Sequence, residues 1–224
     1  VAIPIIDHEN CLVGIVTVDD AMLVMQDETT EDISIMAGVS PNEDSYFGTS
    51  VFQHAKNRTL WLMLLMLSAT VSGEILAHYE DAMAAMPILI TFIPMLMGTS
   101  GNSGSQSSTM VIRGLAVGEI RFKDFFKVLF KELRIALLVG TLLAVVNGIR
   151  VYLMYDQDLM LAVSIGVTMI GIVCMAKCVG CVLPLLAKKI GLDPALMAAP
   201  LISTIMDTCT ILLYFAIITS IYRM

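Results

Sequence analysis

The chain has 224 residues, of which 57% are hydrophobic and only 15% are charged, and its formal net charge is −7. Soluble domains contain roughly 45–50% apolar and 25% charged residues, so this composition disfavours a soluble enzyme and a disordered chain. It also disfavours a nucleic-acid-binding protein, because the sequence has no dense basic patch. The remaining class is a membrane protein with several spans and a small acidic aqueous segment.

The first 25 residues predict two strands and the start of a helix. Short β-branched runs at 3–6 and 12–18 flank a polar turn, and a helical pattern begins near Asp20 and continues to about residue 37. This segment is too small to bury a core of its own. We therefore expect residues 1–25 to be the second half of a larger α/β domain.

Residues 26–58 are expected to form an acidic connecting region. All acidic residues up to Asp44 precede the first base, Lys56, and glycine and proline interrupt the segment. A helix is predicted to start near Ser50 and to lead into the membrane. The connector therefore separates a small aqueous part from the apolar remainder of the chain.

From residue 59 onward, the apolar runs reach the length of a membrane crossing, which is about 20 residues. The sequence thus predicts an all-α polytopic domain over 59–224 with five transmembrane helices. The second and fourth runs exceed the minimum length and are expected to tilt, bend or break. Residues 119–130 mix aromatic and charged side chains, as a helix on the membrane surface would. The five predicted spans are 59–79, 84–112, 131–152, 159–187 and 195–222.

The distribution of bases predicts a cytoplasmic amino end and an outer carboxyl end in the cell membrane. With that orientation the outer segments contain only Arg150 and Arg223, and Lys177 lies inside the fourth span. All other bases fall on the inner side. They are Lys56, Arg58, Arg113, Arg121, Lys123, Lys127, Lys131, Arg134, Lys188 and Lys189.

A polar stretch from Gly98 to Thr109 interrupts the second predicted span. Its glycines free the backbone, and Asn102, Gln106 and several hydroxyl groups supply oxygen ligands. Such a stretch is tolerated at membrane depth only where it lines water or packs inside protein. Close helix packing through small residues is the alternative, but packing alone requires neither amide.

The fifth predicted span contains one acid, Asp207, near its centre. A charge there is costly in lipid and indicates a functional site by default. Ser203 and Thr204 precede it by about one helical turn, so their hydroxyl groups are further candidate ligands. The alternative is that Asp207 pairs with Lys177 of the fourth span.

These candidate ligands are oxygen atoms without histidine or cysteine, a set that suits hard divalent cations. Mg²⁺ releases its water reluctantly, so one carboxylate with amides and carbonyls fits a hydrated Mg²⁺ ion. The same atoms would also accept Mn²⁺, Co²⁺ or Ca²⁺. The sequence predicts a cation channel rather than an enzyme, with a proton- or sodium-coupled secondary transporter as the alternative.

Two other chemistries have weaker support. Cys174, Cys178 and Cys181 share a helical face and could bind a soft metal, although no histidine is near them and buried small residues are the favoured explanation. Ser103 lies in a Gly-x-Ser-Gly pattern of the kind found in intramembrane serine proteases. That mechanism needs a histidine base on a later span, and His78 is the last histidine in the sequence.

Several motifs closely resemble those of the MgtE magnesium channels, and the resemblance extends over the whole chain. The strongest are the glycine-rich run that contains Asn102 and the segment that contains Asp207. The matching motifs are Pro94-x3-Gly98-x2-Gly101-Asn102-x-Gly104-x-Gln106, Arg113-Gly114-Leu115-Ala116, Lys131-Glu132, Leu183-Pro184, Asp193-Pro194-Ala195 and Pro200-Leu201-x-Ser203-Thr204-x-x-Asp207.

The resemblance implies a homodimer in the lipid bilayer, with an ion path along the dimer axis. It places Mg²⁺ at Asp207, with Asn102 and Gly98 nearby. It also identifies residues 1–25 as the end of a second CBS domain and residues 27–33 as part of a plug helix that closes the pore.

The resemblance further implies that Mg²⁺ is a regulatory ion as well as the transported one. Acidic residues repel one another until divalent ions neutralise them, so a cluster of acids could gate the pore. A solvated acidic helix face is the alternative for any one of them. The gating candidates are Asp19, Asp20, Asp27, Glu28, Glu31 and Asp32.

Overall fold

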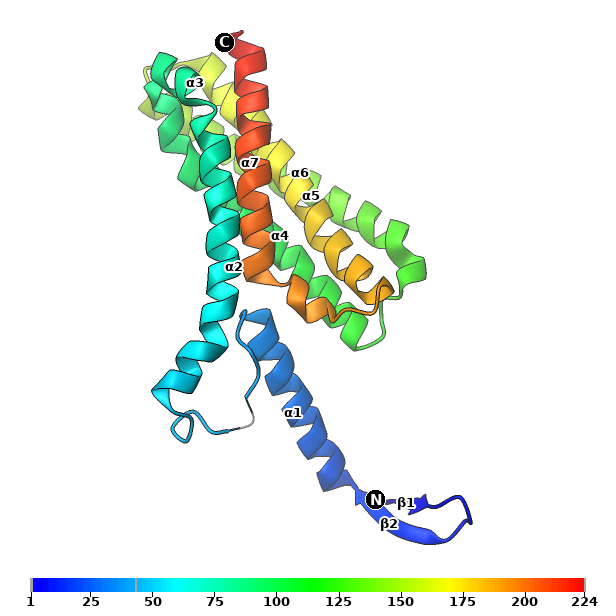
Figure 1. Cartoon of the computed structure of the whole chain (residues 1–224). Coiled ribbons are helices and arrows are strands. Elements are labelled where there is room, and N and C mark those ends of the chain that lie inside the picture. The colour runs from blue at the N-terminus through cyan, green and yellow to red at the C-terminus, as the bar shows by residue number, and fades with distance from the viewer. Residues whose placement is uncertain (1, 43, 224) are drawn as a thin grey trace.

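The structure is a computed structural model that describes residues 2–42 and 44–223, and most of these residues are helical. A small antiparallel hairpin and one helix precede a bundle of long helices (Figure 1). The elements in chain order are β1 (Ala2–Ile6), β2 (Leu12–Thr17), α1 (Val18–Met36), α2 (Val51–Ala77), α3 (Glu80–Ala85), η1 (Pro87–Phe92), α4 (Ile93–Ala116), η2 (Phe122–Asp124), α5 (Phe125–Met154), α6 (Leu159–Lys189), η3 (Pro194–Met197) and α7 (Ala199–Tyr222).

The hairpin and α1 confirm the strand–turn–strand–helix prediction for the amino end. The Asp7 carboxylate accepts hydrogen bonds from the backbone N–H groups of Glu9 and Cys11, at 2.8 and 2.9 Å, which closes the turn. Thr17 and Asp20 form a reciprocal capping box that starts α1. The apolar side chains of both strands are exposed, in keeping with the expectation that this segment cannot bury a core of its own.

Four of the five predicted spans coincide with helices that are long and apolar enough to cross a membrane: α2, α5 with η2, α6 and α7. The second predicted span is divided differently. Its first part covers the end of α3 and all of η1, and α4 follows as one continuous helix of 24 residues. At 1.5 Å per residue, α4 is about 36 Å long, which exceeds the ~30 Å hydrocarbon core. Its polar residues, however, make it less apolar than a typical membrane span.

The position of the break is a correction to the sequence interpretation. The glycine-rich stretch was expected to loosen the backbone, yet α4 runs through it without interruption. The change of conformation occurs earlier, at Met86 and the 3₁₀ segment η1. There, the Tyr214 hydroxyl of α7 donates a 3.0 Å hydrogen bond to the Leu89 carbonyl oxygen and fixes the segment against the bundle.

Two smaller expectations also change. The predicted surface helix over 119–130 does not exist as a separate element, because α5 begins at Phe125 and continues without a break through the third span. The long fourth span is likewise a single helix, α6, that contains Pro184. Helix α5 is therefore longer than the predicted span 131–152, whereas α6 closely follows the predicted span 159–187 and contains no break.

The bundle is assembled around α4 and α6. In Figure 1, α7 and α2 run side by side, while α1 and the hairpin extend away from the bundle. The backbones of α4 and α6 meet so closely that a Cβ atom on Gly180 would overlap the Gly104 carbonyl group. A Cβ atom on Gly104 would in turn lie 2.7 Å from Ile202 of α7. Small residues are therefore required where three helices converge.

Candidate functional site at the α4–α7 crossing

The polar stretch of α4 has two faces with different environments. Gly101, Gly104 and most of the serines are buried against α6 and α7, as the packing interpretation predicted. Gly98, Asn102 and Gln106 recur at four-residue intervals and lie on the exposed face. An exposed row of glycine and amide groups inside a membrane domain must be covered by water or protein.

Hydrogen bonds from α4 to η3 and α7 fix the depth of Asp207. The Thr210 hydroxyl donates a 2.6 Å hydrogen bond to Ser100 Oγ, and Ser108 donates one to the Met197 carbonyl oxygen, so the two helices run antiparallel. A Cβ atom on Gly101 would lie 3.2 Å from Ser203 Oγ. Because Asp207 lies between Ser203 and Thr210, it is level with the Gly98–Asn102 part of α4.

The Asp207 side chain is half-buried, and its carboxylate forms no ion pair within the described part of the chain. Within residues 2–42 and 44–223, no lysine, arginine or histidine nitrogen lies within 4.0 Å of it. The proposed pairing with Lys177 is therefore absent from this part of the chain. A carboxylate at membrane depth without a base needs water, a cation or a second chain beside it.

Lys177 instead belongs to a buried polar cluster that joins α4, α5 and α6. Its Nζ lies 4.0 Å from Glu132 Oε2 and donates a 3.4 Å hydrogen bond to Ser107 Oγ. The Ser107 hydroxyl in turn donates to the same Glu132 oxygen. Glu132 was not predicted as the partner of Lys177, which is only 4% exposed; a lysine inside an apolar span indicates that an acid lies near it but not which acid.

Of the remaining predicted ligands, some are free to face the Asp207 carboxylate and others are not. Ser203 is partly exposed next to Gly101, but Thr204 is buried and its hydroxyl donates a 2.7 Å hydrogen bond to the Pro200 carbonyl oxygen. Gln106 lines a cavity of about 510 Å³ that also contains Glu132 and Lys177. The structure therefore brings Gly98, Asn102 and Ser203 to the level of Asp207, whereas the Thr204 hydroxyl is bonded within α7 and Gln106 lies about one turn further along α4, beside Glu132 and Lys177.

No group of three or more acidic, histidine or cysteine side chains that could hold a metal ion occurs among the described residues. The three cysteines of α6 do not converge, and the Cys181 thiol donates to the Cys178 carbonyl oxygen. A single copy therefore offers one carboxylate at the α4–α7 crossing, in addition to hydroxyl, amide and backbone oxygens. That set fits an ion that keeps most of its water.

Two acids of α1 have distinct environments outside the membrane. Hydrogen bonds from the Thr17 side chain and backbone hold the pKa of Asp20 below its usual value, so Asp20 has a structural role as a helix cap. Burial, together with the charges of Asp193 and Glu28, raises the pKa of Asp32. Asp32 thus lies at the junction of α1 with η3, where neutralisation of its charge is favourable.

Comparisons with known proteins identify the family of this chain. Residues 93–217 match the model of the MgtE family, described as divalent cation transporters, and that range contains α4, α5, α6 and nearly all of α7. The match covers more than half of the chain. The chain belongs to the MgtE family. Both Asn102 and Asp207 lie within the matched range, whereas the hairpin, α1 and α2 lie before it.

Relatives extend the MgtE match to almost the entire chain. The magnesium transporter MgtE of Thermus thermophilus is 36% identical over 215 residues, which is 96% of this chain and 47% of the relative. The magnesium transporter MgtE of Bacillus subtilis is 34% identical over 219 residues, or 98% of this chain and 48% of the relative. The chain thus spans about half the length of these curated relatives.

Proposed function

We propose that this chain conducts Mg²⁺ across the cell membrane, with Asp207 as the central charged ligand. The observation that carries the proposal is the half-buried Asp207 carboxylate, which has no basic partner in the described chain and lies level with Asn102 and Gly98. A hydrated Mg²⁺ ion would compensate the charge without the closed cage that a dehydrated ion requires. The names of the relatives support the choice of ion.

A homodimer would complete the ion path. The exposed row of Gly98, Asn102 and Gln106 must be covered at membrane depth, and a second copy can cover it while leaving water between the two chains. Two copies of Asp207 across a two-fold axis would then balance the charge of one divalent ion. We infer that the ion passes between the chains rather than through one of them.

The direction of transport follows from the proposed orientation, with the amino end in the cytoplasm. A divalent ion that enters gains about 4.6 kcal/mol per 100 mV of inside-negative potential, so no energy-coupling domain is needed. A proton- or sodium-coupled transporter remains the rival function. Ohmic single-channel currents would favour the channel, whereas saturable uptake that depends on a proton or sodium gradient would favour the rival.

Replacement of Asn102 by alanine is expected to lower Mg²⁺ conduction or its selectivity against Ca²⁺. The reason is that the exposed amide supplies a hydrogen-bonding oxygen for the water shell of the ion, and alanine supplies none. The measurement is Mg²⁺ and Ca²⁺ flux into proteoliposomes with an ion-reporting dye. Cys178→Ala is the matched control and should be neutral; a loss of flux in this control would revive a soft-metal site.

We further propose that residues 1–25 are the end of a CBS domain and that α1 is a plug whose acids sense Mg²⁺. The contact between α1 and η3 and the exposed apolar side chains of the hairpin support this assignment. Mg²⁺ would neutralise the acids at the junction and hold α1 against the bundle. Of the six gating candidates, Asp32 is the best placed, and Asp20 is already engaged as a helix cap.

This gating proposal predicts that the Mg²⁺ concentration needed to close the channel depends on pH. The raised pKa of Asp32 means that its contact with η3 is strengthened as the pH falls through that pKa and weakened as the pH rises. Less Mg²⁺ should therefore close the channel at lower pH, and Asp32→Asn should reduce this dependence. Half-inhibiting Mg²⁺ concentrations at several pH values would measure it. Glu9→Gln on the distant hairpin should retain the wild-type dependence, and an unchanged Asp32→Asn profile would contradict the assignment.

A further inference from the structure

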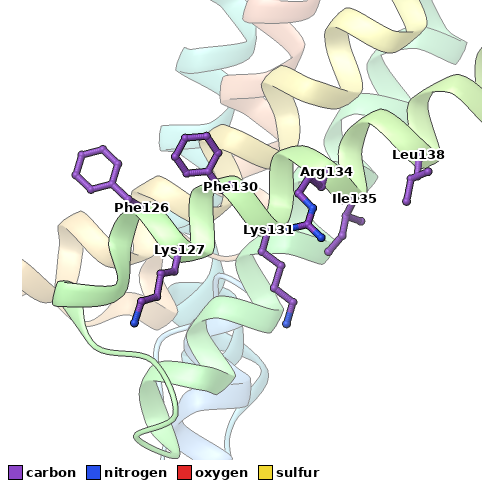
Figure 2. A pocket seen from close by; sticks show the side chains of 7 residues that line it. All are labelled: Phe126, Lys127, Phe130, Lys131, Arg134, Ile135 and Leu138. Atoms are coloured by element: carbon purple, nitrogen blue, oxygen red, sulfur yellow. The ribbon is translucent and has the colours of Figure 1, made fainter.

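The amino-terminal half of α5 has a basic and aromatic surface groove that the transport proposal does not use. The groove encloses about 680 Å³ and is lined by side chains of α5 alone: Phe126, Lys127, Phe130, Lys131, Arg134, Ile135 and Leu138. Figure 2 shows the rings of Phe126 and Phe130 on one side of the helix and the amines of Lys127 and Lys131 on the other. Three of its apolar members are strongly exposed, Phe126 at 69%, Phe130 at 64% and Leu138 at 76%.

The positive charge of this groove is largely uncompensated. Lys127 pairs with Asp124 at 3.2 Å, and the neighbouring acid Glu132 is committed to Lys177. Lys131 and Arg134 have no acidic partner within 4.0 Å anywhere in residues 2–42 and 44–223. Two free bases beside exposed phenylalanines, at the end of a membrane-crossing helix, attract an anionic group that is attached to something apolar.

A second groove continues along the same face of α5. Positions 131, 134, 138, 141 and 145 follow the three- to four-residue spacing of one helix face. From Thr141 onward, this face and α6 border an almost wholly apolar groove of about 470 Å³. Its floor is the close contact of α5 with α6, where a Cβ atom on Gly166 would lie 3.9 Å from Ala144 Cβ.

The two grooves together match the dimensions of one phospholipid. Lys131 and Val145 are fourteen positions apart, which corresponds to about 21 Å along the helix and to about half of a bilayer that is 40–45 Å thick with its headgroups. The basic groove would therefore hold a headgroup, and the apolar groove would hold an acyl chain. A second copy across a two-fold axis is disfavoured because it would place the same bases opposite one another.

We propose that this face of α5 is a binding site for an anionic phospholipid, in which Lys131 and Arg134 contact the phosphate and the α5–α6 groove holds an acyl chain. The probe is a nanodisc with equal parts of phosphatidylglycerol and phosphatidylcholine. After extraction into detergent, mass spectrometry counts the lipids that the protein retains. The wild type should retain phosphatidylglycerol in excess, and Lys131→Gln/Arg134→Gln should lower that excess by about tenfold.

Two further variants make the test specific. Lys56→Gln/Arg58→Gln removes the same charge from the exposed inner end of α2 and should keep the wild-type excess. Val145→Trp fills the apolar groove without a change of charge and should lower the retention of both lipids. Equal retention of the two lipids by the wild type, or equal losses in both double variants, would overturn the proposal. Efficient cross-linking between copies at Phe130→Cys would assign this face to a second chain and would also overturn it.

Discussion

Replacement of Asp207 by alanine should abolish Mg²⁺ uptake while the protein still inserts into the membrane. Asp207 is the only acid in α7, it lies level with Asn102, and no base within residues 2–42 and 44–223 lies within 4.0 Å of its carboxylate. Interactions with a charged group contribute about 1.5–3 kcal/mol, so the loss of uptake should be at least about tenfold. Mg²⁺-reporting dye in proteoliposomes measures the rate.

Two comparisons separate a transport defect from a folding defect. Asp207→Asn retains the shape and hydrogen-bonding oxygen of the side chain but lacks its charge, so it should be defective almost to the same degree as the alanine variant. Asp81→Ala removes an exposed acid of the short helix α3 and should transport normally. Wild-type uptake in Asp207→Ala would remove this residue from the ion path.

The second large effect concerns the stability of the bundle. Lys177→Met should destabilise the protein by about 3 kcal/mol, because it leaves the Glu132 carboxylate without its cation in the interior of the bundle. Lys127→Met is the matched control, since that lysine pairs with Asp124 on the surface and should contribute about 0.5 kcal/mol or less. The midpoint of unfolding in mixed detergent micelles measures both.

A double variant tests which acid is the partner of Lys177. Lys177→Met/Glu132→Gln removes both charges and retains an oxygen that accepts the Ser107 hydrogen bond, so it should recover most of the lost stability. If Lys177→Met/Asp207→Asn recovers the stability instead, Asp207 pairs with Lys177 and the transport proposal loses its basis. This variant therefore checks the site independently of any flux assay.

Hydropathy predicted the parts of the fold that depend on composition. The spans that became α2, α5, α6 and α7 are continuous apolar runs, and lipid requires such runs to form helices. The second span was harder because α4 contains a polar stretch, and its polarity suggested a broken backbone. In the structure, small residues allow α4 to pack closely as a continuous helix. The break occurs at Met86, where proline and tertiary contacts determine the conformation.

In the candidate site, too, some residues could be proposed from the sequence, and others depend on tertiary contacts that the sequence does not reveal. Asp207 and Asn102 could be identified from sequence because each is a polar residue in an apolar context. The partner of Lys177 could not, because Glu132 lies on a different helix and meets Lys177 only after α5 packs against α6. The burial of Thr204 could not be predicted either, because sequence spacing gives a helix face but not the neighbour that covers it.

The most direct test of the account is a crystal of the protein soaked in Mn²⁺, in which anomalous density reports the ion. The account predicts density beside the Asp207 carboxylate, on the exposed face of α4 near Asn102 and between two chains. Density elsewhere, together with an Asp207 side chain that lies against the Lys177 amine with no aqueous route past it, would contradict the account.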